Sequence, residues 1–162
     1  MDNTHPNSEV ILLAHKVRKA TQKLAKKLPK ETFITSPNLE GYCAIASHAL
    51  SRILKAYGYC PKIVFAELNN NGGHAWVELD EWIIDLTASQ FGEPGEYSEV
   101  FIAREIDSNL HRGSFHKEFE ECDYGYSSKE NWEKYLWNPK YFWDEYFQEW
   151  EDELFERLRP RN

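Results

Sequence analysis

Three short segments of the sequence carry a thiol, an imidazole and a carboxylate, the side chains that a cysteine-nucleophile enzyme uses. Cys43 lies at the expected start of a helix, His74 near the start of an expected strand, and Asp85 in the strand that follows. The unpaired N–H groups at a helix N-terminus favour the thiolate form of a cysteine. A neighbouring histidine can hold the proton, and a carboxylate can fix the histidine tautomer. We therefore expect these three residues to form a catalytic triad.

The separation of His74 and Asp85 can be tested against the geometry of a hairpin. If Glu78 pairs with Ile83, Asp85 becomes the diagonal neighbour of His74 on the same face of the sheet. A shift of one residue would place the two side chains on opposite faces. Because Asp-Glu is not a favoured two-residue turn, we expect a four-residue loop closed by Glu78 and Ile83.

The same alternation divides the hairpin into two faces. Ala75, Val77 and Leu79 share one side with Ile84 and Leu86, and the other side carries the histidine and the aspartate. We expect the helix that begins with the nucleophile to cover this polar side, so that the thiol meets the imidazole.

Hydrophobic periodicity predicts an α+β fold, in which an antiparallel meander follows two helices. The first helix is expected from about Ser8, its N-cap, to Leu28 before Pro29, and the second from about Cys43 to Tyr57. Residues 105–127 show no regular pattern and are expected to be irregular. The expected strands cover residues 62–68, 74–79, 82–86 and 100–103.

The C-terminal part is rich in aromatic residues at helical spacing. Helices are expected from Lys129 to Trp137 and again after Pro139. This stripe either packs on the rest of the fold or forms a partner-binding surface. The chain of 162 residues suits one domain, with a core over about 36–104 and a helical C-terminal extension over about 128–160.

Composition excludes several classes of protein. The first thirty positions hold seven basic and two acidic residues, but the chain has a net charge of −8, which disfavours nucleic acid as a partner. Three cysteines without a CxxC pair indicate neither a disulfide framework nor a zinc site. No apolar run is long enough for a membrane span, and no signal peptide is apparent. We expect a cytoplasmic protein, and the oligomeric state stays open.

Around the candidate residues the chain resembles the transglutaminase-like branch of the papain-like cysteine enzymes. The resemblance covers about residues 36–92 and implies a papain-like core in which the nucleophile helix packs on an antiparallel sheet. It implies Cys43 as nucleophile, His74 as general base and acid, Asp85 as orienting carboxylate, and a thioester intermediate without metal or cofactor. Family members also use an oxyanion donor upstream of the nucleophile, for which Asn38 is the candidate. The matching segments are Gly41–Ala44 with the helix behind it, His74–Leu79 and Trp82–Thr87.

The expected reaction is hydrolysis of an amide in a protein or peptide, by a peptidase or a glutamine deamidase. An amine in place of water would give cross-linking by the same triad, and small size favours hydrolysis. A non-catalytic interaction module that uses the aromatic C-terminal part is a second class. A metal hydrolase built on His74, Asp85 and either His111 or His116 is a third, although no paired-ligand motif supports it.

Overall fold

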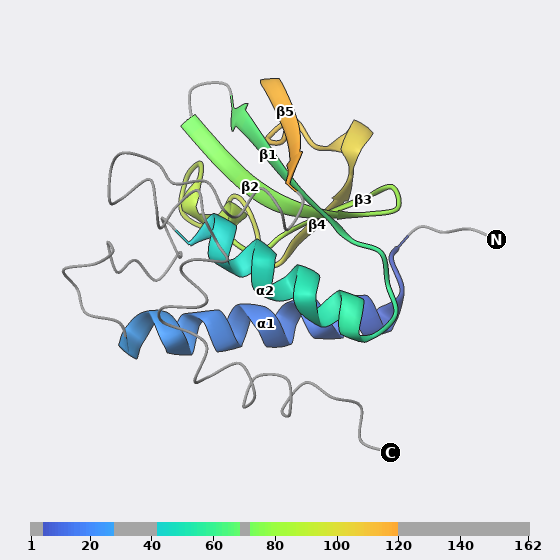
Figure 1. The fold of residues 1–162 in the computed structure, drawn as a ribbon. Helices are drawn as coiled ribbons and strands as arrows, with labels where there is room; N and C mark the ends of the chain where they lie inside the picture. Colours follow the sequence, from blue (N-terminus) through green and yellow to red (C-terminus); the bar gives the residue numbers. More distant parts are fainter. Residues whose placement is uncertain (1–4, 28–41, 69–71, 120–162) are drawn as a thin grey trace, which may run out of the picture.

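The computed structural model describes residues 5–27, 42–68 and 72–119, which form two helices and a five-stranded antiparallel sheet (Figure 1). The expected α+β class is confirmed at this level. The strands lie in the order β4-β3-β2-β1-β5. Two short 3-10 helices lie between strands in the sequence, η1 between β3 and β4 and η2 between β4 and β5. The elements are α1 (Ser8–Lys27), α2 (Cys43–Ala56), β1 (Lys62–Leu68), β2 (Gly72–Leu79), β3 (Trp82–Asp85), η1 (Ala88–Gln90), β4 (Phe101–Arg104), η2 (Glu105–Asp107) and β5 (Gly113–Phe119).

The β2–β3 hairpin has the predicted register, because Glu78 pairs with Ile83. The prediction of a four-residue loop is wrong, since the ladder continues to Leu79 and Trp82 and leaves a two-residue turn. Asp80 takes a φ of 54° in that turn. Aspartate enters this left-handed region more readily than most residues, so an Asp-Glu turn can close the hairpin.

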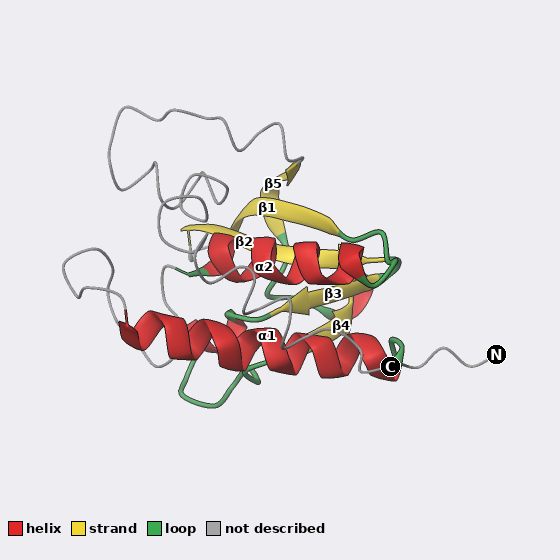
Figure 2. Ribbon diagram, turned by 60° about the horizontal axis from the view of Figure 1, so that its bottom comes forward, coloured by secondary structure: helices red, strands yellow, loops and turns green. Residues whose placement is uncertain are grey.

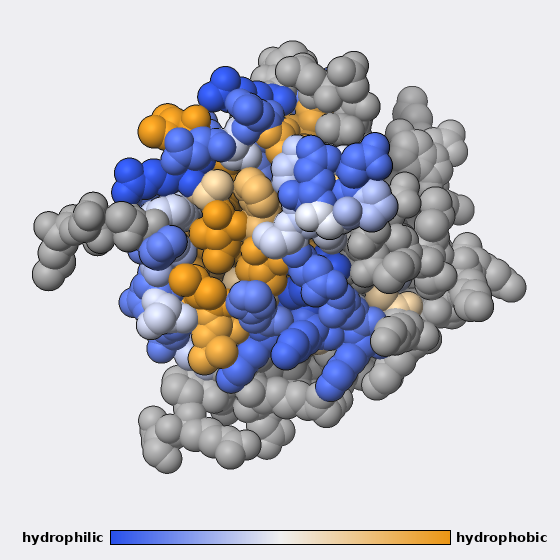
Figure 3. Space-filling view, turned by 180° about the vertical axis from the view of Figure 1, so that it is seen from behind, coloured by the Kyte–Doolittle hydropathy of each residue, from blue (hydrophilic) through white to orange (hydrophobic). Residues whose placement is uncertain are grey.

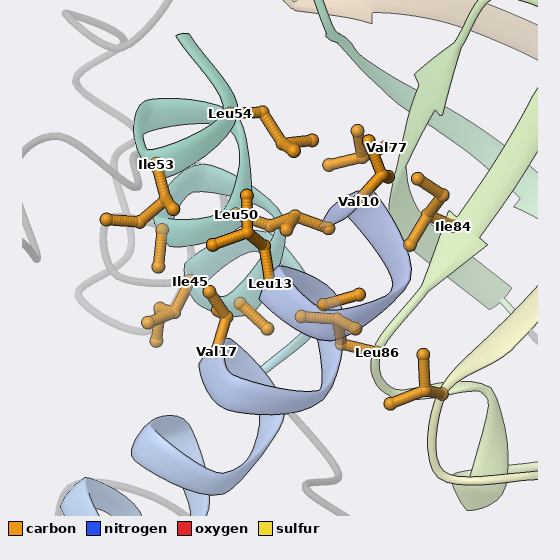
Figure 4. Close-up of a cluster of buried hydrophobic side chains, with 14 of the residues drawn as sticks. Val10, Leu13, Val17, Ile45, Leu50, Ile53, Leu54, Val77, Ile84 and Leu86 are labelled. Carbon is orange, nitrogen blue, oxygen red and sulfur yellow. The ribbon is translucent and has the colours of Figure 1, made fainter. Parts of the chain in front are cut away.

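Both helices lie on one side of the sheet, with α1 alongside α2 (Figures 1 and 2). The two helices bury amphipathic stripes against each other and against the apolar face of the β2–β3 hairpin, as Figure 4 shows. Among the described residues, neither helix is long and apolar enough to cross a membrane. The core on this side includes Val10, Leu13 and Val17 of α1, Ile45, Leu50, Ile53 and Leu54 of α2, and Val77, Ile84 and Leu86 of the hairpin and its end.

The opposite face of the sheet has a separate apolar cluster. Val64 and Trp76 pack there with Ile83, and residues that follow β3, such as Ala88 and Leu110, cover them. The expectation that α2 covers the face of the histidine and the aspartate is therefore wrong. The apolar stripe of α2 instead packs on the apolar face of the hairpin, which offers it more surface to bury. Seen from behind, apolar surface gathers in the middle of the molecule with hydrophilic residues around it (Figure 3).

Two further expectations can be compared with the structure. Asn7 rather than Ser8 caps α1, because the Asn7 side chain accepts a hydrogen bond from the Glu9 N–H at 2.8 Å. The irregular structure expected after residue 104 is wrong in part, since β5 extends the sheet by pairing with β1. The predicted helices within 128–160, and Asn38, lie outside the described residues.

Two neighbouring leucines of α1 allow the packing of this helix to be tested. Leu13 is 2% exposed and Leu12 is 54% exposed. Replacing Leu13 with Ala should lower the free energy of unfolding by about 2–5 kcal/mol, because the change leaves a cavity in the core. The same change at Leu12 should alter it by less than about 0.5 kcal/mol. Urea denaturation of both variants measures the difference, and equal losses would contradict this packing of α1.

Candidate active site

The structure brings His74 and Asp85 together at the centre of the site. The Nε2 atom of His74 lies 2.6 Å from Oδ2 of Asp85. They come from neighbouring strands in the predicted register, and both residues are 0% exposed. A buried carboxylate needs donors for its oxygens, and an imidazole N–H is a strong one. The predicted histidine–aspartate pair is present.

The second carboxylate oxygen of Asp85 is held locally. The backbone N–H of Thr87 donates to Oδ1 at 2.9 Å. This bond from residue i+2 to an aspartate side chain is an Asx turn, which forms where a strand ends in Asp-x-Thr. The local sequence therefore fixes part of the carboxylate orientation.

His111 is the site residue that sequence reasoning did not place. It comes from the segment after η2, and its Nε2 atom lies 2.7 Å from the same Oδ2 of Asp85. Its Nδ1 atom lies 2.5 Å from the hydroxyl of Ser108. The sequence offered His111 only as one possible metal ligand. No local pattern shows that this segment folds back over the β2–β3 hairpin.

His74 and Asp85 shift each other's pKa towards the charged forms. Burial alone lowers the pKa of His74, but the Asp85 charge and hydrogen bond, together with Cys43, outweigh burial and raise this pKa from 6.5 to about 10. Burial raises the pKa of Asp85, yet the charge of His74 and the hydrogen bonds from His111 and His74 bring it well below its ordinary range. The two shifts favour an imidazolium–carboxylate pair at neutral pH.

Cys43 is the first residue of α2 and is close enough to His74 to affect the pKa of its ring. Its side chain interacts with the imidazole of His74 and contributes to the raised pKa of that ring. Nε2 of His74 faces the carboxylate, and Nδ1 has no hydrogen-bond partner within the described ranges. Nδ1 is thus the ring atom left for the thiol. Cys43 is partly exposed, so solvent reaches the residue even though the other two are buried.

A buried arginine supports the strand end that carries Asp85. The guanidinium of Arg18, on α1, donates a hydrogen bond to the carbonyl of Leu86. It also lies 4.0 Å from the carboxylate of Glu99. Burial lowers the pKa of Arg18, and the charges of Glu99 and Asp85 oppose that shift. The N-terminal helix therefore anchors the residue next to the buried aspartate.

The two histidines and the aspartate also form a possible metal-ligand set. One ligand atom from each of His74, Asp85 and His111 lies within 4.8 Å of the others. However, the nitrogen–oxygen distances of 2.6 and 2.7 Å are those of hydrogen bonds. Atoms bound to one zinc ion at about 2.0–2.2 Å lie roughly 3.3 Å apart in a tetrahedral site. The arrangement fits a carboxylate shared by two imidazole donors better than a metal centre.

No family model matches the chain, and searches of curated proteins and of solved structures give no match either. The function must therefore be inferred from the chemistry of the site.

Proposed function

We propose that the protein is a cysteine acyl-transfer enzyme of the transglutaminase-like type, acting on an amide in a protein or peptide substrate. The observation that carries the proposal is the buried His74–Asp85 pair next to a partly exposed cysteine at a helix N-terminus. A charged imidazole favours a neighbouring thiolate, and the thiolate is the nucleophilic form of cysteine. Buried structural cysteines have no such partner.

The proposed reaction has two steps. The Cys43 thiolate attacks the amide carbon, and the imidazolium of His74 gives its proton to the nitrogen as the C–N bond breaks. The amine leaves and a thioester remains on the sulfur. His74 then removes a proton from water as the water oxygen attacks the thioester carbon. The C–S bond breaks and the carboxylic acid leaves, which restores the Cys43 thiolate and the His74 imidazolium. Asp85 keeps the imidazole oriented throughout and stabilises its positive charge.

The oxyanion formed in each step needs hydrogen-bond donors. The first N–H groups of a helix have no acceptor within the helix, so the backbone N–H of Cys43 is one candidate donor. Asn38 is the second candidate from the sequence. Hydrolysis by a peptidase or a glutamine deamidase is the preferred outcome, and an amine acceptor would give cross-linking by the same residues.

Selective alkylation of Cys43 tests the proposal without knowledge of the substrate. Cys60 is the matched control, because it is more exposed than Cys43. At about pH 6 an ordinary thiol is almost entirely protonated, so iodoacetamide should label Cys43 at least about 10-fold faster than Cys60. His74→Ala should remove this advantage. Peptide mass spectrometry measures each rate, and labelling that follows exposure alone would overturn the proposal.

A further inference from the structure

Asp85 receives hydrogen bonds from two imidazoles, and the proposed reaction uses only one of them. His74 and His111 both place Nε2 within 2.7 Å of Oδ2, while Oδ1 accepts from the N–H of Thr87. Arg18 acts on the carboxylate through its charge and directs a hydrogen bond to the Leu86 carbonyl instead. His111 is thus a second imidazole donor to the carboxylate oxygen that His74 contacts, and it has no part in the proposed reaction.

Ser108 determines which nitrogen of His111 faces the carboxylate. Its hydroxyl lies 2.5 Å from Nδ1 and can donate to it, which leaves the ring proton on Nε2 for Asp85. Ser108 is itself held by a backbone bond from its N–H to the carbonyl of Glu105. At 2% exposed it is closed to a substrate, so its role is to orient the ring and not to act as a nucleophile.

Aromatic side chains fix the plane of the His111 ring. Trp76 meets it edge-on with ring centroids 4.8 Å apart, and Phe101 stacks on it at 5.3 Å. These contacts leave the ring little freedom to turn away from Asp85. They also exclude water, which strengthens a hydrogen bond to a charged oxygen.

We propose that His111 is a positioning residue of the acyl-transfer site, which holds the Asp85 carboxylate in the orientation that His74 requires; this inference rests on the function proposed above. Without His111, one oxygen of the carboxylate keeps the Thr87 N–H and the other keeps only His74. Oδ2 is then held by one donor instead of two, so the carboxylate and the histidine ring that it orients are less firmly fixed. The imidazolium and the neighbouring thiolate both become less favourable.

Two amide replacements test the role of the second donor. His111→Gln keeps an N–H near the position of Nε2, whereas His111→Asn carries the same amide on a shorter side chain that cannot reach Asp85. Ser108→Ala is an independent variant that leaves the ring and its packing in place. All three retain Arg18, the other charged group that acts on Asp85.

The measurement is the rate of Cys43 alkylation by iodoacetamide as a function of pH, with a thermal melt of each variant. In His111→Asn, the pH of half-maximal alkylation should rise by about one unit, which is about a 10-fold loss of rate on the acid side. The profile of His111→Gln should lie close to that of the wild type. Ser108→Ala should raise the pH of half-maximal alkylation as His111→Asn does, but by less. A purely structural role would lower the melting temperature without moving the profile.

The outcomes separate this inference from the proposed function. If wild-type Cys43 reacts no faster than Cys60, the acyl-transfer proposal fails and the role of His111 fails with it. If wild-type Cys43 is selectively reactive but His111→Asn keeps the wild-type profile, only the positioning role is overturned. Should the Asn variant not fold, an unshifted profile in Ser108→Ala would overturn the role equally.

Discussion

Replacing Asp85 with Asn should slow acyl transfer by Cys43 on the order of 10³- to 10⁴-fold, because the amide can no longer fix the histidine tautomer or stabilise the imidazolium. The carboxylate is the larger of the two contributions, from Asp85 and Cys43, that raise the pKa of His74 against the effect of burial. Without the charge of Asp85, the His74 ring should lose its proton at neutral pH. The Cys43 thiol would then no longer have a positively charged neighbour. Hydrolysis of p-nitrophenyl acetate provides the measurement, with the acylated Cys43 peptide identified by mass spectrometry.

Asp107→Asn is the matched control for this change. It makes the same substitution at an exposed carboxylate on η2. The control should hydrolyse the ester at the wild-type rate. An Asp85→Asn protein that folds and also hydrolyses at the wild-type rate would show that Asp85 has no part in the chemistry.

The His74–Asp85 pair should make stability depend on pH in a particular direction. The pKa of Asp85 is lower in the folded protein than in the unfolded one. Its contribution to the free energy of unfolding is therefore present above the ordinary pKa of 3.8 and is lost as the pH falls through the pKa of the folded state. The pKa of His74 is higher in the folded protein than in the unfolded one. Its contribution to the free energy of unfolding is therefore present below the ordinary pKa of 6.5 and is lost as the pH rises towards about 10. The pair should therefore stabilise the fold most between about pH 4 and 6.5.

Urea denaturation of wild type and Asp85→Asn at about pH 3, 5.5 and 9 measures this contribution. Breaking one side of a buried pair should lower the free energy of unfolding by about 3 kcal/mol at the middle pH. The difference between the proteins should shrink at both extremes, and Asp107→Asn should follow the wild type throughout. Parallel curves for wild type and Asp85→Asn would rule out a folded-state charge pair.

The hairpin shows how much of this site local sequence can predict. Alternation of apolar and polar residues excludes a shift of one residue, and the pairing of Glu78 with Ile83 places Asp85 beside His74. The turn was predicted incorrectly, because the preference against Asp-Glu is weak compared with the pairing of Leu79 with Trp82. Strand pairing and burial therefore outweighed turn preference here.

What the sequence did not predict depends on contacts between distant segments. Strand β5 shows no clear alternation, and it joins the sheet because β1 offers it an unpaired edge. His111 reaches Asp85 across 26 positions of sequence. Amphipathicity showed that α2 must bury a stripe, and the apolar face of the hairpin receives it; the expectation that α2 covers the polar face followed from the supposed triad and not from this pattern.

The bond from Arg18 to the Leu86 carbonyl has a consequence for how the chain can be shortened. Removing the first 27 residues would take away the whole of α1. It would also leave a buried carbonyl without its donor one residue from Asp85. A truncated protein without reactivity would thus say nothing against the cysteine, because the deletion would have disturbed the carboxylate from the far side of the molecule.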